Sequence, residues 1–340
     1  MKRTLEGLVV AVVISATGCV ANMSNLSMSA PPVTSQAQDQ DGKYDSVDDF
    51  VNPENIKKLK DASYMVISEA KYKNPKGEEV ALHSLGTAEI YTNIKKKTYL
   101  VTANHVVQND DVMYRFPSME EVKKVSDQFF LLEDYQVNIL HDTMRKSNEE
   151  TENERFYVED ASGNKKEVFN YIRTSEEMAN VLKTMKPKKI EIVAQNETKD
   201  LAVISVPKLS HLPLAYSIGD AKELQAQNIV LVTGYPKGYF KNVNRGYVTS
   251  ENDSRLLDKN YENAFIFDAS ISPGNSGGGI FAVRDGKFEL VGITSAMYMG
   301  ANDLYIGVKI NGVSEVFKRN SIRCVDGWKC NFSSSEELKL

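Results

Sequence analysis

The sequence predicts an all-β protein built from antiparallel β-barrels. Ten short runs are either continuously apolar or alternate apolar and polar residues, and residues typical of turns separate them. Short strands at this spacing are characteristic of barrels and sandwiches rather than of helical folds. The runs cover residues 63–69, 87–92, 98–102, 190–194, 202–206, 229–233, 263–267, 279–283, 290–295 and 304–309.

Composition excludes several classes of function. The chain has 340 residues and a net charge of −5 with mixed signs, so it offers no basic face for nucleic acid. It contains no glycine loop of the kind that cradles phosphates. The histidines His83, His141 and His211 show no metal-ligand spacing. We therefore expect no cofactor, no metal and no nucleic-acid partner.

The N-terminal residues predict export. Two positive charges precede the apolar run 8–14, which is too short to span a membrane, so residues 1–18 are expected to be a signal peptide. Residues 16–19 resemble a bacterial lipoprotein box ending at Cys19, and lipid on Cys19 would hold the protein at a membrane surface. Residues 19–50, rich in Ser, Gln, Asp and Pro, would then form a flexible tether.

Two alternatives remain open for this segment. A lipoprotein box usually has leucine where this chain has Ala16, so ordinary cleavage and secretion without a lipid is the other possibility. Val20 and Ala21 include no aspartate of the kind that retains lipoproteins at an inner membrane. The outer membrane or periplasm of a bacterial envelope is therefore the favoured location.

One serine lies within a glycine-rich run, and this makes it a candidate nucleophile. Residues 272–279 read Ser-Pro-Gly-Asn-Ser-Gly-Gly-Gly, with Ser276 among the glycines. A serine hydroxyl needs a histidine to accept its proton and a carboxylate to orient that histidine. His105 and Asp200 each lie at the end of a short predicted strand. Taken singly, each residue is as well explained by a turn or a structural role, but the order His, Asp, Ser is that of double-barrel proteases.

The surrounding motifs strengthen that interpretation. Residues 102–107, 200–203 and 268–278 resemble the histidine, aspartate and serine motifs of the chymotrypsin-like serine proteases, and are closest to the HtrA-type branch. Residues 85–88, 233–236 and 291–296 agree as flanking segments. The resemblance implies two antiparallel six-stranded β-barrels over residues 51–319.

The resemblance also implies roles for individual residues. His105, Asp200 and Ser276 would form the catalytic triad, and the backbone N–H groups of Gly274 and Ser276 would form the oxyanion hole. The specificity pocket would be lined by Ser270, Thr294, Ser295 and Ala296. Because Ser270 is not acidic, we expect cleavage of polypeptides after small or apolar residues and not after Lys or Arg.

Two departures from the family are visible. The long interval between His105 and Asp200 predicts an insertion at about residues 109–188, and capping patterns predict helices from Ser118 toward Leu132 and from Thr174 toward Met185. A hairpin is expected between them, at residues 156–172. The insertion could act as a lid, a substrate clamp or an oligomer contact, or it could be a tolerated surface excursion. No PDZ domain is expected after the barrels.

The last residues, 320–340, form a tail that contains Cys324 and Cys330. With Cys19 lipidated, these two cysteines remain as an even pair, and export allows a disulfide between them. Two free thiols are the alternative. The sequence as a whole predicts a serine endopeptidase of the bacterial cell envelope. The alternative is a lipoprotein with a protease fold that binds or holds proteins with little or no catalysis.

Overall fold

The computed structural model describes most of the chain after residue 40. The described residues are 41–46, 53–73, 79–108, 123–150, 157–159, 165–167, 176–209, 214–251, 263–297, 303–318, 321–324, 327–331 and 338–339. The expected signal peptide and the lipidation site at Cys19 lie outside them. None of the helices in these ranges combines the length and apolar character needed to cross a membrane.

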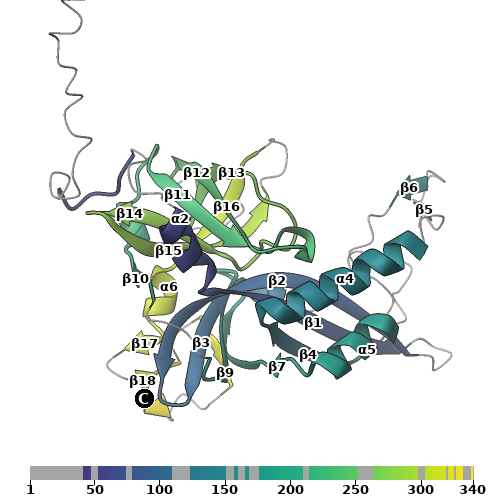
Figure 1. Cartoon of the computed structure of the whole chain (residues 1–340). Helices are drawn as coiled ribbons and strands as arrows, with labels where there is room; N and C mark the ends of the chain where they lie inside the picture. Colours follow the sequence, from purple (N-terminus) through teal and green to yellow (C-terminus); the bar gives the residue numbers. More distant parts are fainter. Residues whose placement is uncertain are drawn as a thin grey trace, which may run out of the picture. The chain divides into compact units, whose positions relative to one another are not determined.

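The first of two large sheets is antiparallel and open (Figure 1). Its strand order is β19-β8-β9-β3-β2-β1-β4-β7. The strands are β1 (Ser63–Lys73), β2 (Glu79–Ile94), β3 (Lys97–Thr102), β4 (Lys123–Leu132), β7 (Lys188–Lys189), β8 (Glu191–Asn196), β9 (Leu201–Pro207) and β19 (Lys329–Cys330). The edge strands β7 and β19 each pair over only two residues. The sheet therefore curls without closing into a full barrel.

The second sheet contains a closed barrel. Its strands are β10 (Tyr216–Ile218), β11 (Ile229–Gly234), β12 (Asn242–Ser250), β13 (Ala264–Ala269), β14 (Gly279–Arg284), β15 (Lys287–Met297) and β16 (Tyr305–Lys309). Six of them, β11 to β16, form an antiparallel barrel that the pairing of β15 with β16 closes, and β10 adds in parallel to β15. The predicted chymotrypsin-like double-barrel fold is confirmed, with its first barrel open.

The remaining elements belong to neither large sheet. The helices are α2 (Pro53–Lys60), α4 (Asp134–Glu150), α5 (Glu176–Met185) and α6 (Asn311–Ser314), with 3₁₀ turns η1 (Asn104–Val106), η4 (Ala221–Glu223) and η5 (Pro236–Gly238). The small strands are β5 (Tyr157–Glu159), β6 (Lys165–Glu167), β17 (Phe317–Lys318), β18 (Ser321–Ile322) and β20 (Leu338–Lys339).

The central strand β9 shows why the sequence pattern is apolar without alternation. Residues 201–206 are all buried. Strand β9 shares one apolar cluster with the C-terminal residues Val313, Val316 and Trp328, and α6 contacts it. Burial on both faces removes the polar positions that a half-exposed strand would show.

The insertion is partly helical, as predicted, but the first predicted helix is wrong over residues 123–132, and residues 118–122 lie outside the described part of the chain. The range predicted as a helix from Ser118 to Leu132 ends in strand β4, which pairs with β1 and places Leu131 opposite Val66. Phe129, Leu131 and Leu132 are buried in that arrangement. Pairing with a strand far back in the chain outweighs the local helical pattern.

The rest of the insertion follows the prediction more closely. Helix α5 (Glu176–Met185) matches the second predicted helix, and β5 pairs with β6 in the predicted hairpin. Helix α4 was not predicted. Because β4 and β7 belong to the open sheet, the insertion contributes strands to the barrel as well as helices outside it.

The C-terminal tail returns to the open sheet. Cys324 and Cys330 form the predicted disulfide, with their Cα atoms 5.9 Å apart. The bond closes a short loop around the buried Trp328 and holds β19 against β8, the strand that precedes Asp200. The tail is thus a structural part of the first barrel.

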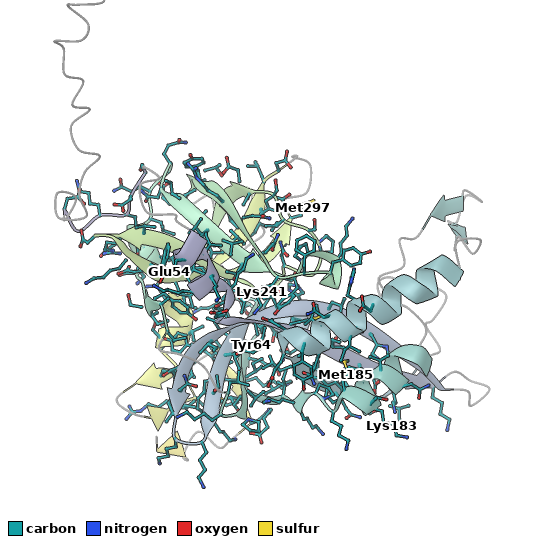
Figure 2. All side chains as sticks on the ribbon, in the orientation of Figure 1. Glu54, Tyr64, Lys183, Met185, Lys241 and Met297 are labelled. Carbon is teal, nitrogen blue, oxygen red and sulfur yellow. A yellow bond between two sulfur atoms is a disulfide. The ribbon has the colours of Figure 1, made fainter. Side chains whose placement is uncertain are left out.

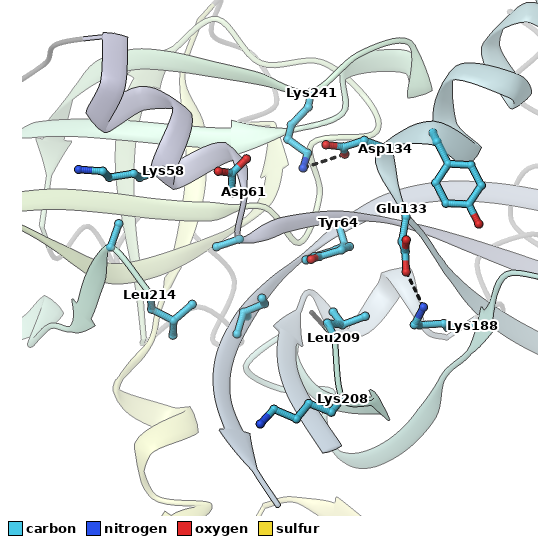
Figure 3. A pocket seen from close by; sticks show the side chains of 14 residues that line it. Lys58, Asp61, Tyr64, Glu133, Asp134, Lys188, Lys208, Leu209, Leu214 and Lys241 are labelled. Carbon is cyan, nitrogen blue, oxygen red and sulfur yellow. Dashed lines mark hydrogen bonds and ion pairs between the residues drawn. The ribbon is translucent and has the colours of Figure 1, made fainter. Parts of the chain in front are cut away.

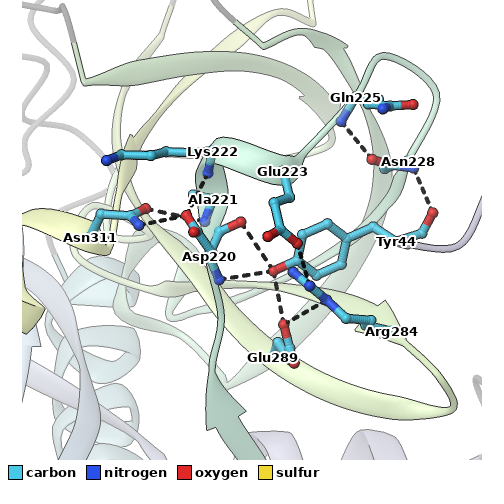
Figure 4. Close-up of polar contacts among 10 residues, drawn as sticks. All are labelled: Tyr44, Asp220, Ala221, Lys222, Glu223, Gln225, Asn228, Arg284, Glu289 and Asn311. Carbon is cyan, nitrogen blue, oxygen red and sulfur yellow. Dashed lines mark hydrogen bonds and ion pairs between the residues drawn. The ribbon is translucent and has the colours of Figure 1, made fainter. Parts of the chain in front are cut away.

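Packing extends N-terminally into the range 19–50 that the sequence analysis assigns to a tether. The hydroxyl of Tyr44 donates to Glu289 Oε2 at 2.8 Å and accepts from the backbone N–H of Asp220 at 3.0 Å (Figure 4). The Arg284 guanidinium lies over the Tyr44 ring, 4.0 Å from its centroid. These contacts fasten the Tyr44 side chain to the closed barrel.

A buried carboxyl lies where the two barrels meet. Glu89, on β2, accepts hydrogen bonds from the hydroxyls of Ser63 at 2.7 Å and Thr233 at 2.9 Å. The Tyr216 hydroxyl lies 3.4 Å from its other oxygen. Burial raises the pKa of Glu89 to about 7, although these hydroxyl hydrogen bonds oppose the shift. The folded protein therefore holds this proton up to near neutral pH.

We predict that Glu89 makes stability fall as pH rises. Its pKa is higher in the folded than in the unfolded chain, so its contribution is complete at acid pH and is lost as pH rises through about 7. Glu89→Gln keeps a neutral side chain at every pH. The free energy of unfolding of this variant, minus that of wild type, should therefore increase by on the order of a few kcal/mol from pH 5 to pH 8. Urea unfolding at several pH values measures this. Glu54→Gln on the exposed face of α2 is the control, and a pH-independent difference for Glu89→Gln would contradict the prediction.

Candidate active site

His105 lies in a tight turn that directly follows a buried strand. Strand β3 ends at Thr102, and η1 begins two residues later. The N–H of Val106 donates to the carbonyl of Ala103 at 3.1 Å, and the N–H of Val107 donates to Asn104 at 3.0 Å. This turn carries His105 out of the sheet and leaves its side chain about one third exposed, with a side-chain exposure of 35%.

Asp200 lies in the turn between β8 and β9 and orients His105. Its Oδ2 lies 2.9 Å from His105 Nδ1, and its Oδ1 accepts from the backbone N–H of His105 at 2.9 Å. The backbone carbonyl of Asp200 accepts from Asn104 N at 3.1 Å. The Ser295 hydroxyl also donates to Oδ2. The carboxylate therefore holds both the ring and the backbone of His105.

The same contacts keep Asp200 ionised. Burial alone would raise its pKa, but the charge interaction with His105 and the hydrogen bonds from His105 and Ser295 outweigh burial and lower it. An ionised carboxylate facing Nδ1 favours the tautomer that carries its proton there.

Ser276 lies beside this pair. Its hydroxyl donates to the carbonyl of Ser295 at 3.4 Å, and the hydroxyl of Ser295 in turn binds Asp200. Ser295 thus connects Ser276 to the Asp200 carboxylate. Within the described residues, Ser276 Oγ makes no hydrogen bond to His105. The structure brings all three predicted residues to one place, with Ser276 turned toward Ser295.

The predicted oxyanion donors have free N–H groups. Among the described residues, the backbone N–H groups of Gly274 and Ser276 donate to no protein acceptor, whereas the neighbouring Asn275 N and Gly277 N donate at 3.0 and 2.7 Å. Gly274 has φ +100°, and a Cβ there would lie 2.3 Å from the carbonyl oxygen of Tyr235. Glycine is required at this position on both counts.

The predicted pocket residues separate into two groups. Thr294 and Ser295 are buried on β15, and the Ser295 side chain points toward Asp200. Ser270 is exposed, and its carbonyl accepts from Asn244. Ala296 is half-buried at the end of the same strand.

Thr87 is a site residue that the sequence analysis did not single out. Its N–H donates to the carbonyl of Ser276 at 2.7 Å, and its hydroxyl donates to the carbonyl of Gly274 at 2.8 Å. The only sequence signal was its place in the flanking segment 85–88, because bonds to a loop far along the chain leave no local pattern.

Comparison with known families identifies the family of this domain. A sequence model described as a trypsin-like peptidase domain matches residues 86–293, more than half of the chain. The chain belongs to this family. The predicted resemblance to chymotrypsin-like serine proteases of the HtrA type is also confirmed, because individual proteins similar to this trypsin-like peptidase are named as HtrA-like and DegP-like serine proteases.

Two curated relatives illustrate the match. "Serine protease HtrA-like" of Staphylococcus aureus (strain bovine RF122 / ET3-1) is 30% identical over 139 residues, which is 38% of this chain and 18% of the relative. "Probable periplasmic serine endoprotease DegP-like" of Hahella chejuensis is 34% identical over 108 residues, 32% of this chain and 22% of the relative. The matched segments therefore span only about a fifth of each relative's length.

A solved structure gives a more distant likeness. The HtrA-type protease AlgW with a decapeptide has a TM-score of 0.46 and 18% identity, and the match covers 77% of this trypsin-like peptidase and 65% of AlgW.

We predict that the Ser276 loop tolerates no side chain at Gly277. This residue has φ +86°, and a Cβ would lie 2.0 Å from Thr87 O and 2.1 Å from Thr102 Oγ1. Gly277→Ala should lower the free energy of unfolding by about 2–4 kcal/mol. Gly327→Ala is the matched control, since Gly327 has φ +81° but its Cβ would meet its nearest neighbour at 3.5 Å. Equal losses in the two variants would show that backbone strain alone, without the close approach, explains the effect.

Proposed function

We propose that this trypsin-like peptidase is a serine endopeptidase in which Ser276, His105 and Asp200 form the catalytic triad. The observation that carries the proposal is that the Asp200 carboxylate contacts His105 twice, at ring Nδ1 and at the backbone N–H. With its proton on Nδ1, the imidazole offers Nε2 as the base. An isolated structural histidine would not need both contacts.

The reaction then follows from these groups. His105 Nε2 takes the proton of Ser276 as Oγ forms a bond to the peptide carbonyl carbon. The N–H groups of Gly274 and Ser276 stabilise the negative oxygen. Collapse of this intermediate breaks the C–N bond, and His105 returns the proton to the leaving amine. Water then attacks the acyl-enzyme with His105 again as base, and Ser276 is released.

The orientation of Ser276 is compatible with this mechanism. Its bond to the Ser295 carbonyl is long, at 3.4 Å, and a hydroxyl turns by rotation about one bond. Hydrogen bonds between catalytic groups are often long in free enzymes and shorten when substrate binds.

Cleavage preference is the next part of the proposal. No acidic side chain occurs among Ser270, Thr294, Ser295 and Ala296, so we propose that polypeptides are cut after small or apolar residues and not after Lys or Arg.

We also propose that the enzyme acts in a bacterial cell envelope. Residues 1–18 would direct export, and a lipid on Cys19 would hold the protein at a membrane surface. The printed name of the Hahella chejuensis relative describes that protein as probably periplasmic. Secretion without a lipid is the alternative.

A second candidate function rests on the same serine. Because Ser276 donates to Ser295 and not to His105, the site could belong to a protein that binds polypeptides without cutting them. The free N–H groups of Gly274 and Ser276 favour catalysis over this alternative.

We predict that Ser276 is the nucleophile. The purified protein should react covalently with a fluorophosphonate probe and digest an unfolded protein substrate, and Ser276→Ala should abolish both. Ser272→Ala, in the same loop, should keep both. Labelling is read by mass spectrometry of the modified peptide, and cleavage by sequencing the products, which also reports the preferred residue. Absence of both activities from wild type would support the binding protein, and activity retained in Ser276→Ala would exclude this triad.

We predict further that Asp200→Asn binds substrate but turns it over slowly. An amide can hold the imidazole in the wrong tautomer and cannot stabilise its charged form, which in comparable triads lowers kcat by about 10⁴-fold. Steady-state kinetics on a peptide identified above would measure kcat and KM separately. A loss of less than about tenfold would argue that Asp200 does not orient the base.

A further inference from the structure

Helix α4 of the insertion contacts residues 235–241 of the closed barrel. Asp134, the first residue of α4, accepts a hydrogen bond from the Tyr235 hydroxyl at 2.9 Å and pairs with Lys241 Nζ at 2.8 Å through the same oxygen, Oδ1. Two turns further along, the His141 ring packs edge-on against the Tyr239 ring, with centroids 5.3 Å apart. The insertion is therefore bonded to both ends of this segment.

The groups that Asp134 contacts are buried. Tyr235 is 1% exposed, and the Lys241 side chain is 10% exposed. The Lys241 ammonium lies over the rings of Tyr64 and Tyr235, 5.5 and 5.6 Å from their centroids. Lys241 and Tyr64 are labelled in Figure 2. A buried ammonium is stable only with an opposite charge or aromatic faces around it. Asp134 is the carboxylate that pairs with it among the described residues, so the insertion completes a cluster within the barrel interface.

The opposite side of the same segment supports the predicted oxyanion loop. The N–H of Lys237 donates to the carbonyl of Pro273 at 2.7 Å. The N–H of Tyr235 donates to the hydroxyl of Thr87 at 3.2 Å, and that hydroxyl donates to the carbonyl of Gly274. The Tyr235 carbonyl approaches Gly274 so closely that no Cβ fits between them. Displacing Tyr235 would therefore displace the peptide unit on which the Gly274 N–H depends.

The surroundings of Asp134 limit the strength of its bonds to Tyr235 and Lys241. A cavity of about 510 Å³ opens beside it, lined on other sides by Lys58, Tyr64 and Lys208 (Figure 3). The Asp134 side chain is 64% exposed, so water competes for its oxygens. Loss of the carboxylate should weaken the position of segment 235–241 without unfolding the barrel.

We propose that Asp134 is a positioning residue for the oxyanion hole. Through Tyr235 and Lys241 it holds segment 235–241, and through that segment it holds Gly274 where its N–H can meet the developing oxyanion. This inference rests on the proposed function for its catalytic consequence, but the coupling itself is a property of the fold. Under this proposal the insertion contributes to catalysis and is not merely a tolerated insertion at the surface.

The kinetic test compares Asp134→Ala with Glu133→Ala. Glu133 is the adjacent carboxylate on the insertion and pairs with Lys188, not with segment 235–241. Oxyanion contacts form in the transition state, so Asp134→Ala should lower kcat by about threefold to tenfold with KM within about twofold. This is the size expected for a partly exposed hydrogen bond, in which water competes for the carboxylate. Asp134→Asn, which keeps an oxygen acceptor for Tyr235, should recover part of kcat. Glu133→Ala should match wild type.

A double-mutant cycle tests whether the effect passes through Tyr235. Tyr235→Phe removes only the hydroxyl and should lower kcat to a similar extent. Combined with Asp134→Ala it should add little, because Asp134→Ala already breaks the bond between Asp134 and Tyr235 as well as the pair with Lys241. Fully additive losses would overturn the proposed route. If Asp134→Ala fails to fold, Tyr235→Phe supplies the same kcat and exchange measurements.

An exchange measurement separates this inference from the proposed function. In the Ser276→Ala background, Asp134→Ala should speed amide hydrogen exchange at residues 235–241 and 272–277, while strand residues 229–233 stay unchanged. If wild type proves inactive but exchange changes as expected, the proposed function fails and the coupling stands. If exchange at 272–277 does not change, or Glu133→Ala lowers kcat equally, the positioning role of Asp134 is wrong.

Discussion

Thr87 is the residue on which the assembled site depends, because it joins the Ser276 loop to the first barrel. Its N–H and hydroxyl donate to the carbonyls of Ser276 and Gly274, and its own carbonyl accepts from the Thr102 hydroxyl at 2.6 Å. Thr102 ends the strand that leads to His105. One residue therefore fixes the distance between the loop that carries the serine and the strand that carries the histidine, and Gly277 is needed because the loop passes so close to it.

The position of Asp200 shows that the structure maintains strain at this site. Asp200 has φ +46°, in the left-handed region that most residues avoid. The preceding turn is closed by Lys199 N donating to the Asn196 side chain at 2.9 Å and by Asp200 N donating to Glu197 O at 3.2 Å. The disulfide-bound strand β19 lies against β8, at the start of this turn. Barrel pairing and the tail together hold a conformation that the turn alone would not favour.

The interface between the barrels is unusually polar for a buried surface. Glu89 accepts hydrogen bonds from the hydroxyls of Ser63 and Thr233, and the ammonium of Lys241 lies over the rings of Tyr64 and Tyr235. Such groups are stable only when each has a partner. The two barrels supply aromatic rings around Lys241, and the first turn of α4 supplies the carboxylate that pairs with it among the described residues.

The sequence by itself determined the double-barrel class and most of the strands, and it singled out His105, Asp200 and Ser276 as candidates, because each of these leaves a local pattern of polarity or motif spacing. It did not determine that β4 is a strand, since its partner β1 lies far back in the chain and local capping residues predicted a helix. Nor did it show that the Ser295 hydroxyl binds Asp200, that Thr87 supports the Ser276 loop, or that Asp134 pairs with Lys241. Each of these joins residues many positions apart. Only the folded chain decides them, because the geometry of a hydrogen bond between distant residues is set by how the barrels pack and not by the sequence on either side of the bond.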